Sequence, residues 1–134
     1  MYLEHANITV TSIDKAIHFL TAAFPDFTVR GQGETENCHW LHLGNQTTYI
    51  ALQQNHQLTP TKDEQYTSNG VNHLGFVIDN LSQVEHRLID AGYQKDPMST
   101  DEKYRKRSYF YDANNVEWEF IEYKTDQNSL RNQY

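Results

Sequence analysis

The second half of this sequence can be laid over the first without a gap, at the 68-residue offset that separates His5 from His73. The segment LEHANITVTSIDKAIHFLTAAF, from residue 3, aligns with VNHLGFVIDNLSQVEHRLIDAG, from residue 71. Apolar character is kept at Ile8/Phe76, Val10/Ile78, Ile13/Leu81 and Ala16/Val84, and the identical pairs are His5/His73, His18/His86, Leu20/Leu88 and Ala23/Ala91. A repeat of this length constrains the fold strongly, because both halves must form the same structural unit.

Local patterns predict the order strand, helix, strand, strand in each half. Residues 3–10 alternate between apolar and polar, and Ser12 is a suitable N-cap for a helix that ends before Pro25. A polar turn is expected at 31–37, followed by strands 38–43 and 47–53. The second half repeats this plan with a strand at 72–78, a helix from about 81 to 91 that ends at Gly92, and strands at 107–111 and 115–123. A short extra strand near 27–30, and again near 93–95, makes each half a βαβββ module.

These patterns predict an α+β fold in which two tandem βαβββ modules form a concave mixed sheet. We expect a single domain over residues 1–124, with modules at about 1–54 and 70–124, a linker at 55–69 and a polar C-terminal tail at 125–134. Each module covers one sheet face with its own helix and leaves the other open. Two modules, within one chain or across a dimer, must share their open faces, so we expect a homodimer.

Composition excludes several classes of partner. The formal net charge of −7 argues against nucleic acid, because phosphate binding needs a basic face. No apolar stretch approaches the length of a membrane span, and no signal peptide precedes the first strand. Cys38 is the only cysteine and cannot form an intrachain disulfide. We therefore expect a cytoplasmic protein that binds a small molecule and neither nucleic acid nor membrane.

Three strands each direct a metal-ligating side chain to the open face of the modules. Trp118 and Phe120 should face the helix layer, which sends Glu119 to the opposite side. The same alternation directs His5 and His73 to the open face of their own strands. Two imidazoles and a carboxylate predict one divalent metal (Fe, Mn, Ni or Zn), whereas the structural alternative is a pair of hydrogen-bonded strand histidines.

The repeat also predicts the number of ligands. Ala51 occupies the position equivalent to Glu119, so a fourth ligand is missing. A three-ligand set leaves coordination positions for substrate, which is typical of catalytic sites. Glu119 is also our candidate catalytic residue. Glu117 shares its strand face but is expected at the rim. Candidate substrate-binding residues are Asn7, Tyr49, Gln53, Arg107, Tyr109 and Tyr111, and for each tyrosine a structural role is equally open.

Three segments resemble the signature segments of the vicinal oxygen chelate superfamily, the glyoxalase, bleomycin-resistance and extradiol dioxygenase fold family. They are LEHANITVTSIDKAIHFL, GVNHLGFVIDNLSQVEHRL and YFYDANNVEWEFIEY. The last is similar to the family pattern Asp-Pro-Asp-Gly-Asn-x-x-Glu-Leu, with Ala113 and Asn115 in place of Pro and Gly, and Asn suits a left-handed turn position. The resemblance implies one divalent metal, held by His5, His73 and Glu119, that chelates two adjacent oxygens of a small substrate.

The resemblance leaves the function open. The first hypothesis is a metal-dependent enzyme with lyase, isomerase or dioxygenase chemistry. In glyoxalase I a fourth ligand stands where this chain has Ala51, whereas His-His-Glu sets occur in extradiol dioxygenases and in fosfomycin-resistance thiol transferases, in which Thr usually replaces Asn7. The alternative is a metal-free small-molecule binding or sequestering protein of the bleomycin-resistance type. A third hypothesis is an accessory domain that kept the scaffold without the activity.

Overall fold

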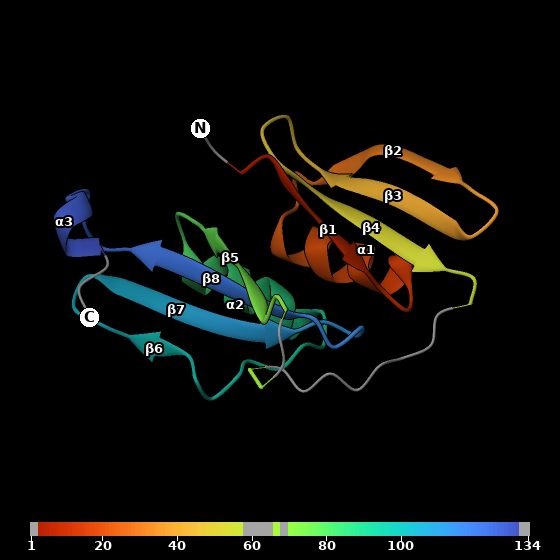
Figure 1. Ribbon diagram of the computed structural model, residues 1–134. Coiled ribbons are helices and arrows are strands. Elements are labelled where there is room, and N and C mark those ends of the chain that lie inside the picture. The colour runs from red at the N-terminus through yellow and green to blue at the C-terminus, as the bar shows by residue number, and fades with distance from the viewer. Residues whose placement is uncertain (1–2, 58–65, 68–69, 132–134) are drawn as a thin grey trace. The chain divides into compact units, whose positions relative to one another are not determined.

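The computed structural model describes residues 3–57, 66–67 and 70–131, which fall into two compact units, 1–62 and 63–134 (Figure 1). Each unit contains one four-stranded mixed sheet and one long helix, and the expected α+β fold of two βαβββ modules is confirmed. Within the described ranges no helix has the length and apolar character needed to cross a membrane.

The first unit comprises β1 (His5–Thr9), α1 (Ile13–Ala23), β2 (Thr28–Glu34), β3 (Cys38–Gly44) and β4 (Tyr49–Asn55), with the strand order β1-β4-β3-β2. Ser12 is the N-cap of α1, as predicted, and its hydroxyl accepts a hydrogen bond from the Lys15 N–H. The polar turn expected at 31–37 is partly wrong, because β2 continues to Glu34. The glycines of β2 allow this pairing: a Cβ on Gly33 would lie 2.8 Å from the Trp40 ring of β3.

The second unit comprises β5 (His73–Val77), α2 (Leu81–Asp90), β6 (Thr100–Asp101), β7 (Arg105–Tyr111), β8 (Glu117–Tyr123) and α3 (Asn128–Arg131), with the strand order β5-β8-β7-β6. The extra strand expected near 93–95 is wrong in position: Lys95 makes only a single bridge to Phe110, and the paired strand is β6. The Asp96 carboxylate accepts a hydrogen bond of 2.7 Å from the Met98 N–H, which turns the chain before β6 begins.

The first and last strands of each unit pair in parallel, and the two pairings have the same register. His5 lies opposite Tyr49 in β1 and β4, and His73 lies opposite Glu117 in β5 and β8. Each of these residues is 68 positions from its counterpart, so the sequence repeat is also a repeat of hydrogen-bond register.

The start of each long helix is held by a side chain from the last strand of the same unit. The Ile13 N–H donates to Gln54 Oε1 at 2.8 Å, and the Leu81 N–H donates to Glu122 Oε2 at 2.6 Å. These are equivalent positions of the repeat. Each bond satisfies an N–H that has no partner within the helix, and so fixes the helix against the strand.

Each sheet buries the face that its own helix covers. In the first unit this core contains Ala16, Phe19, Leu20, Ile50 and Leu52. In the second it contains Leu81, Val84, Leu88, Phe110, Trp118 and Phe120. Because side chains alternate along a strand, burial of these apolar residues sends their neighbours in sequence to the opposite face of each sheet.

The turn between β7 and β8 has the geometry that its sequence predicts. Asn115 has a φ of 64°, in the left-handed region. The Asp112 carboxylate accepts hydrogen bonds from the N–H groups of Asn114 (2.8 Å) and Val116 (2.9 Å), and burial raises the pKa of Asp112. Asn and Gly tolerate such a backbone, whereas β-branched residues do not.

This turn provides a test of the fold. Asn115→Val should lower the free energy of unfolding by about 1–2 kcal/mol, since a β-branched residue is strained at positive φ. Asn115→Gly is the matched control and should preserve stability. Urea unfolding followed by circular dichroism measures both, and equal stability of the two variants would contradict this account of the turn.

Candidate metal centre

His73 and Glu119 meet on the open face of the second sheet, as alternation predicted. The His73 Nε2 lies 3.2 Å from Glu119 Oε2. The His73 side chain is 32% exposed and that of Glu119 is 11% exposed, so the imidazole and the carboxylate converge at a half-buried position. Trp118 and Phe120, on either side of Glu119 in sequence, are fully buried on the helix side of β8.

Two neighbours orient the Glu119 carboxylate. The Tyr109 hydroxyl donates a hydrogen bond of 2.7 Å to Oε1, which leaves Oε2 toward His73. Burial, followed by this bond, raises the pKa of Tyr109 to about 12, so its proton is firmly held. Glu119 also lies over Gly75, where a Cβ would be 3.3 Å from Oε2. The absence of a side chain at Gly75 therefore leaves room for the carboxylate.

Glu117 is not a rim residue, and that expectation is wrong. Its side chain is 1% exposed and accepts a hydrogen bond of 2.6 Å from the Tyr66 hydroxyl. The Tyr66 oxygen is also 3.1 Å from His73 Nδ1. Tyr66 precedes β5 in the chain, and its hydroxyl oxygen therefore contacts His73 of β5 and Glu117 of β8 at the same time.

In the part of the chain that the structure describes, the His73 imidazole is the basic group that the two buried carboxylates meet within ion-pair distance. Within the described residues, the ion pairs of Glu117 and Glu119 are with His73, and neither includes a Lys or Arg. Burying a carboxylate is unfavourable unless positive charge or hydrogen bonds compensate it. This donor set, an imidazole and a carboxylate that converge from two strands, fits a divalent cation.

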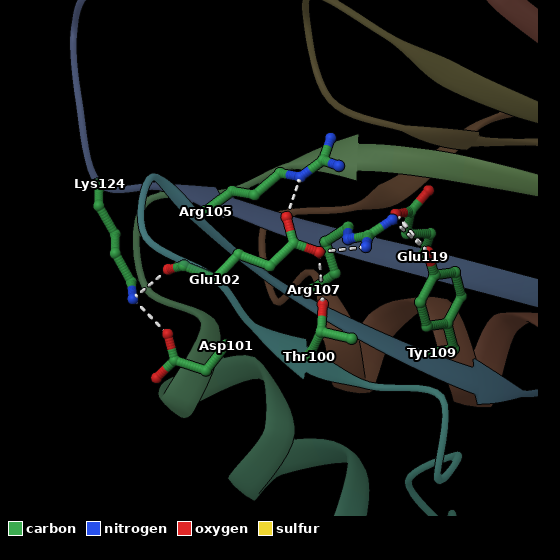
Figure 2. A network of polar contacts seen from close by, with 8 residues as sticks. All are labelled: Thr100, Asp101, Glu102, Arg105, Arg107, Tyr109, Glu119 and Lys124. Atoms are coloured by element: carbon green, nitrogen blue, oxygen red, sulfur yellow. Dashed lines mark hydrogen bonds and ion pairs between the residues drawn. The ribbon is translucent and has the colours of Figure 1, made fainter. Parts of the chain in front are cut away.

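A network of charged residues adjoins Glu119 on the same face (Figure 2). Arg107 Nη1 lies 3.4 Å from the Tyr109 hydroxyl, and its Nη2 binds Glu102 Oε1. Arg105 Nε donates to the other oxygen of Glu102 at 2.8 Å. Both guanidinium groups lower the pKa of Glu102 to about 2. Arg107 is therefore held by Glu102 and lies beside Tyr109, which in turn donates a hydrogen bond to Glu119.

In the first unit, His5 likewise contacts an aromatic ring and a carboxylate. The His5 ring stacks on Tyr49, with centroids 4.6 Å apart, and its Nδ1 lies 3.0 Å from Glu4 Oε2. The Arg30 guanidinium lies 4.5 Å from the centre of the Tyr49 ring. Asn7 and Gln53 are on the same sheet face as His5, according to strand register and alternation.

The structure thus brings together His73 and Glu119, with Tyr109 and Arg107 beside them. His5, Asn7, Tyr49 and Gln53 belong to the first unit. Among the described residues no group of three or more His, Cys, Asp and Glu side chains forms a cation site. Sequence reasoning missed Tyr66 and Glu102: Tyr66 falls in the segment read as a linker, and Glu102 lies in a loop without periodicity.

Comparison with protein families agrees with the fold. The model of the Glyoxalase/Bleomycin resistance protein/Dioxygenase superfamily matches residues 2–120. The chain therefore belongs to this superfamily, whose members include metal enzymes and binding proteins. A comparison with curated protein sequences gives no match.

Several solved structures share the fold over almost their whole length. A glyoxylase/bleomycin resistance protein/dioxygenase domain from Frankia sp. EAN1pec is 22% identical, with a TM-score of 0.79 and 95% of both chains covered. A glyoxalase family protein from Bacillus cereus is 14% identical, with a TM-score of 0.74, and 92% of this chain and 94% of that chain covered. The fosfomycin resistance protein FosX from Mesorhizobium loti is 17% identical, with a TM-score of 0.67, and 96% and 94% covered. At these identities the likeness establishes the fold.

The Glu102 network gives a prediction for pH dependence. Because the folded-state pKa is lowered from 4.5 to about 2, this carboxylate stabilises the protein above pH 4.5, and the contribution is lost as the pH falls from 4.5 through about 2. Carbon-13 NMR of the Glu102 carboxyl, assigned by its loss in Glu102→Gln, should show this acidic titration.

Replacing one guanidinium should move that titration. In Arg105→Met the pKa of Glu102 is expected to rise toward 4.5, since Arg105 contributes the largest lowering effect. A pKa of Glu102 that is unchanged in this variant would show that the network does not form in solution.

Proposed function

We propose that this chain is a metal-dependent enzyme in which His5, His73 and Glu119 hold one divalent ion and a small oxygen-rich substrate takes the remaining coordination positions. The observation that carries the proposal is the approach of His73 Nε2 to Glu119 Oε2, at 3.2 Å, on the open face of the sheet. Membership of a superfamily that includes metal enzymes supports it. His5, the third ligand, follows from the repeat and from the open sheet face that it occupies in its own unit.

The ion, when bound, supplies Lewis-acid chemistry that polarises adjacent substrate oxygens and acidifies a neighbouring proton. The protein orients the reacting groups. The Tyr109 hydroxyl donates a hydrogen bond to Glu119 Oε1, so we assign proton transfer and metal ligation to the other carboxylate oxygen, Oε2. Arg107, whose guanidinium adjoins Tyr109, is suited to bind an anionic substrate oxygen. We also propose that Asn7, Tyr49 and Gln53 bind the substrate. The proposed reaction class is lyase, isomerase or dioxygenase chemistry.

One observation favours the alternative, a metal-free protein that binds or sequesters a small molecule. On the first sheet the rings of Trp40, His42 and Tyr49 follow one another with centroids 5.1 and 4.9 Å apart, and Arg30 lies over Tyr49. Such a row of rings with a nearby cation suits a flat, anionic ligand. This alternative requires no metal, so metal content separates the two functions.

Elemental analysis tests the proposal directly. Protein purified without a tag or chelator should carry a stoichiometric divalent ion, and adding the ion to stripped protein at a hundred times Kd should raise the free energy of unfolding by about 2.7 kcal/mol. Glu119→Gln should lose both effects, because the amide brings no negative charge to the ion. Metal-free protein with a melting temperature that ignores Mn²⁺, Fe²⁺, Ni²⁺ and Zn²⁺ would refute the metal site.

A matched control separates ligand loss from general loss of charge. Asp90→Asn removes one negative charge at an exposed position at the end of α2. This variant should keep the metal content and the metal-dependent rise in stability of the wild type. Equal metal loss in Asp90→Asn and Glu119→Gln would show that ions bind by overall charge alone.

We also propose that the protein is a homodimer, since each unit leaves one sheet face uncovered by its own helix. Light scattering coupled to gel filtration should give twice the chain mass of 15.7 kDa. A monomeric mass across the accessible concentration range would contradict the dimer and leave the metal proposal intact.

A further inference from the structure

The two nitrogens of the His73 ring face two different carboxylates. Nε2 lies 3.2 Å from Glu119 Oε2, and the other ring nitrogen, Nδ1, lies 3.9 Å from Glu117 Oε2. Tyr66 lies between the ring and Glu117, with its hydroxyl oxygen 3.1 Å from Nδ1 and 2.6 Å from Glu117 Oε2. Each ring nitrogen therefore has its own carboxylate neighbour, and Tyr66 joins Nδ1 to Glu117.

The Tyr66 hydroxyl has one proton to donate, and the geometry decides where it goes. A separation of 2.6 Å to a buried carboxylate is that of a charge-assisted O–H···O⁻ bond, which is stronger than a neutral one. The proton thus points to Glu117, and the same bond raises the pKa of Tyr66. Toward His73, the Tyr66 oxygen can then only accept, so the proton between them belongs to Nδ1.

Tyr66 is held in place by an unusual backbone conformation. Its φ is 66°, a left-handed value that a bulky residue rarely adopts. The Tyr66 N–H donates to Asn72 Oδ1 at 2.8 Å, next to His73 in sequence. Strained residues of this kind are retained where surrounding contacts over-determine them, often at functional sites.

We propose that Tyr66 and Glu117 are positioning residues that keep the proton of His73 on Nδ1 and turn the lone pair of Nε2 toward the metal position beside Glu119. Metal-binding histidines commonly donate their second N–H to a carboxylate or another acceptor, which fixes the tautomer and the ring orientation. Here the Tyr66 hydroxyl accepts the bond from Nδ1 and donates its own proton to Glu117, whose side chain is 1% exposed.

This arrangement places two electron pairs opposite each other. With Nδ1 protonated, Nε2 and the Glu119 carboxylate both present lone pairs across 3.2 Å, and a cation between them relieves the repulsion. The metal part of the inference rests on the proposed function, whereas the position of the proton on His73 does not, because it can be measured in metal-free protein.

Nitrogen-15 NMR of chelator-treated protein measures the proton position, since protonated and unprotonated ring nitrogens resonate in separate regions. The His73 signals are assigned by their loss in His73→Gln, at a pH high enough that the ring is neutral. The wild type should carry the proton on Nδ1. Tyr66→Phe, which removes the acceptor, should move it to Nε2, where Glu119 can accept it.

Glu117→Gln is the second variant and keeps the volume of the side chain. The amide no longer attracts the Tyr66 proton strongly, so that proton can turn to His73 Nδ1 and the ring proton should again appear on Nε2. Tyr104→Phe removes a hydroxyl elsewhere in the same unit and should leave the tautomer on Nδ1. Backbone amide spectra establish that each variant is folded.

The outcomes are distinct. A wild-type proton on Nε2, or a folded Tyr66→Phe protein that keeps it on Nδ1, overturns the inference whatever the metal content. If the tautomer shifts as expected, metal affinity should fall about 10- to 100-fold in both variants, the range seen when such outer partners are lost. A tautomer shift in a protein that binds no metal would uphold the positioning roles and refute the proposed function.

Discussion

The parallel pairing of β5 with β8 determines where the polar groups of the second unit lie. Its register sets His73 opposite Glu117 and Gly75 opposite Glu119. Burial of Trp118 under α2 decides which face of β8 carries the acids. A slip of one residue would place the carboxylates in the apolar core and the tryptophan on the open face, which is strongly unfavourable. Burial of the apolar residues on one face of β8 therefore keeps the carboxylates on the opposite face.

The two units place different side chains at equivalent positions of one scaffold. At equivalent positions, the first unit pairs Asn7 with Ala51, and the second pairs Gly75 with Glu119. In each pair a small residue adjoins a larger one, but on opposite strands. In the second unit Gly75 leaves room for the Glu119 carboxylate, because a Cβ at Gly75 would lie 3.3 Å from Glu119 Oε2. The proposed metal site therefore takes a carboxylate from the last strand of the second unit and none from the equivalent position of the first, which is Ala51.

The basic residues near Glu119 are kept from neutralising it. Arg107 is the guanidinium that reaches Tyr109, and Glu102 binds it on the other side. The acid that bonds to Arg107 is thus Glu102, whereas Glu119 accepts a hydrogen bond from Tyr109 and faces the His73 ring. The Glu119 carboxylate thus keeps its negative charge at the proposed cation site. The Arg107 guanidinium is separated from it by the Tyr109 hydroxyl.

The sequence alone determined the repeat, the helix boundaries, the strand faces and the left-handed turn at Asn115, because these depend on periodicity and on short-range backbone chemistry. It also determined that His73 and Glu119 share a sheet face. Only the tertiary structure decided the position of β6, the burial of Glu117 and the approach of Tyr66 to His73. Tyr66 lies seven residues before its partner in a segment without periodicity, and its role depends on packing against a strand that comes some fifty residues later. Contacts of this kind leave no local pattern, since their geometry is set by the whole sheet.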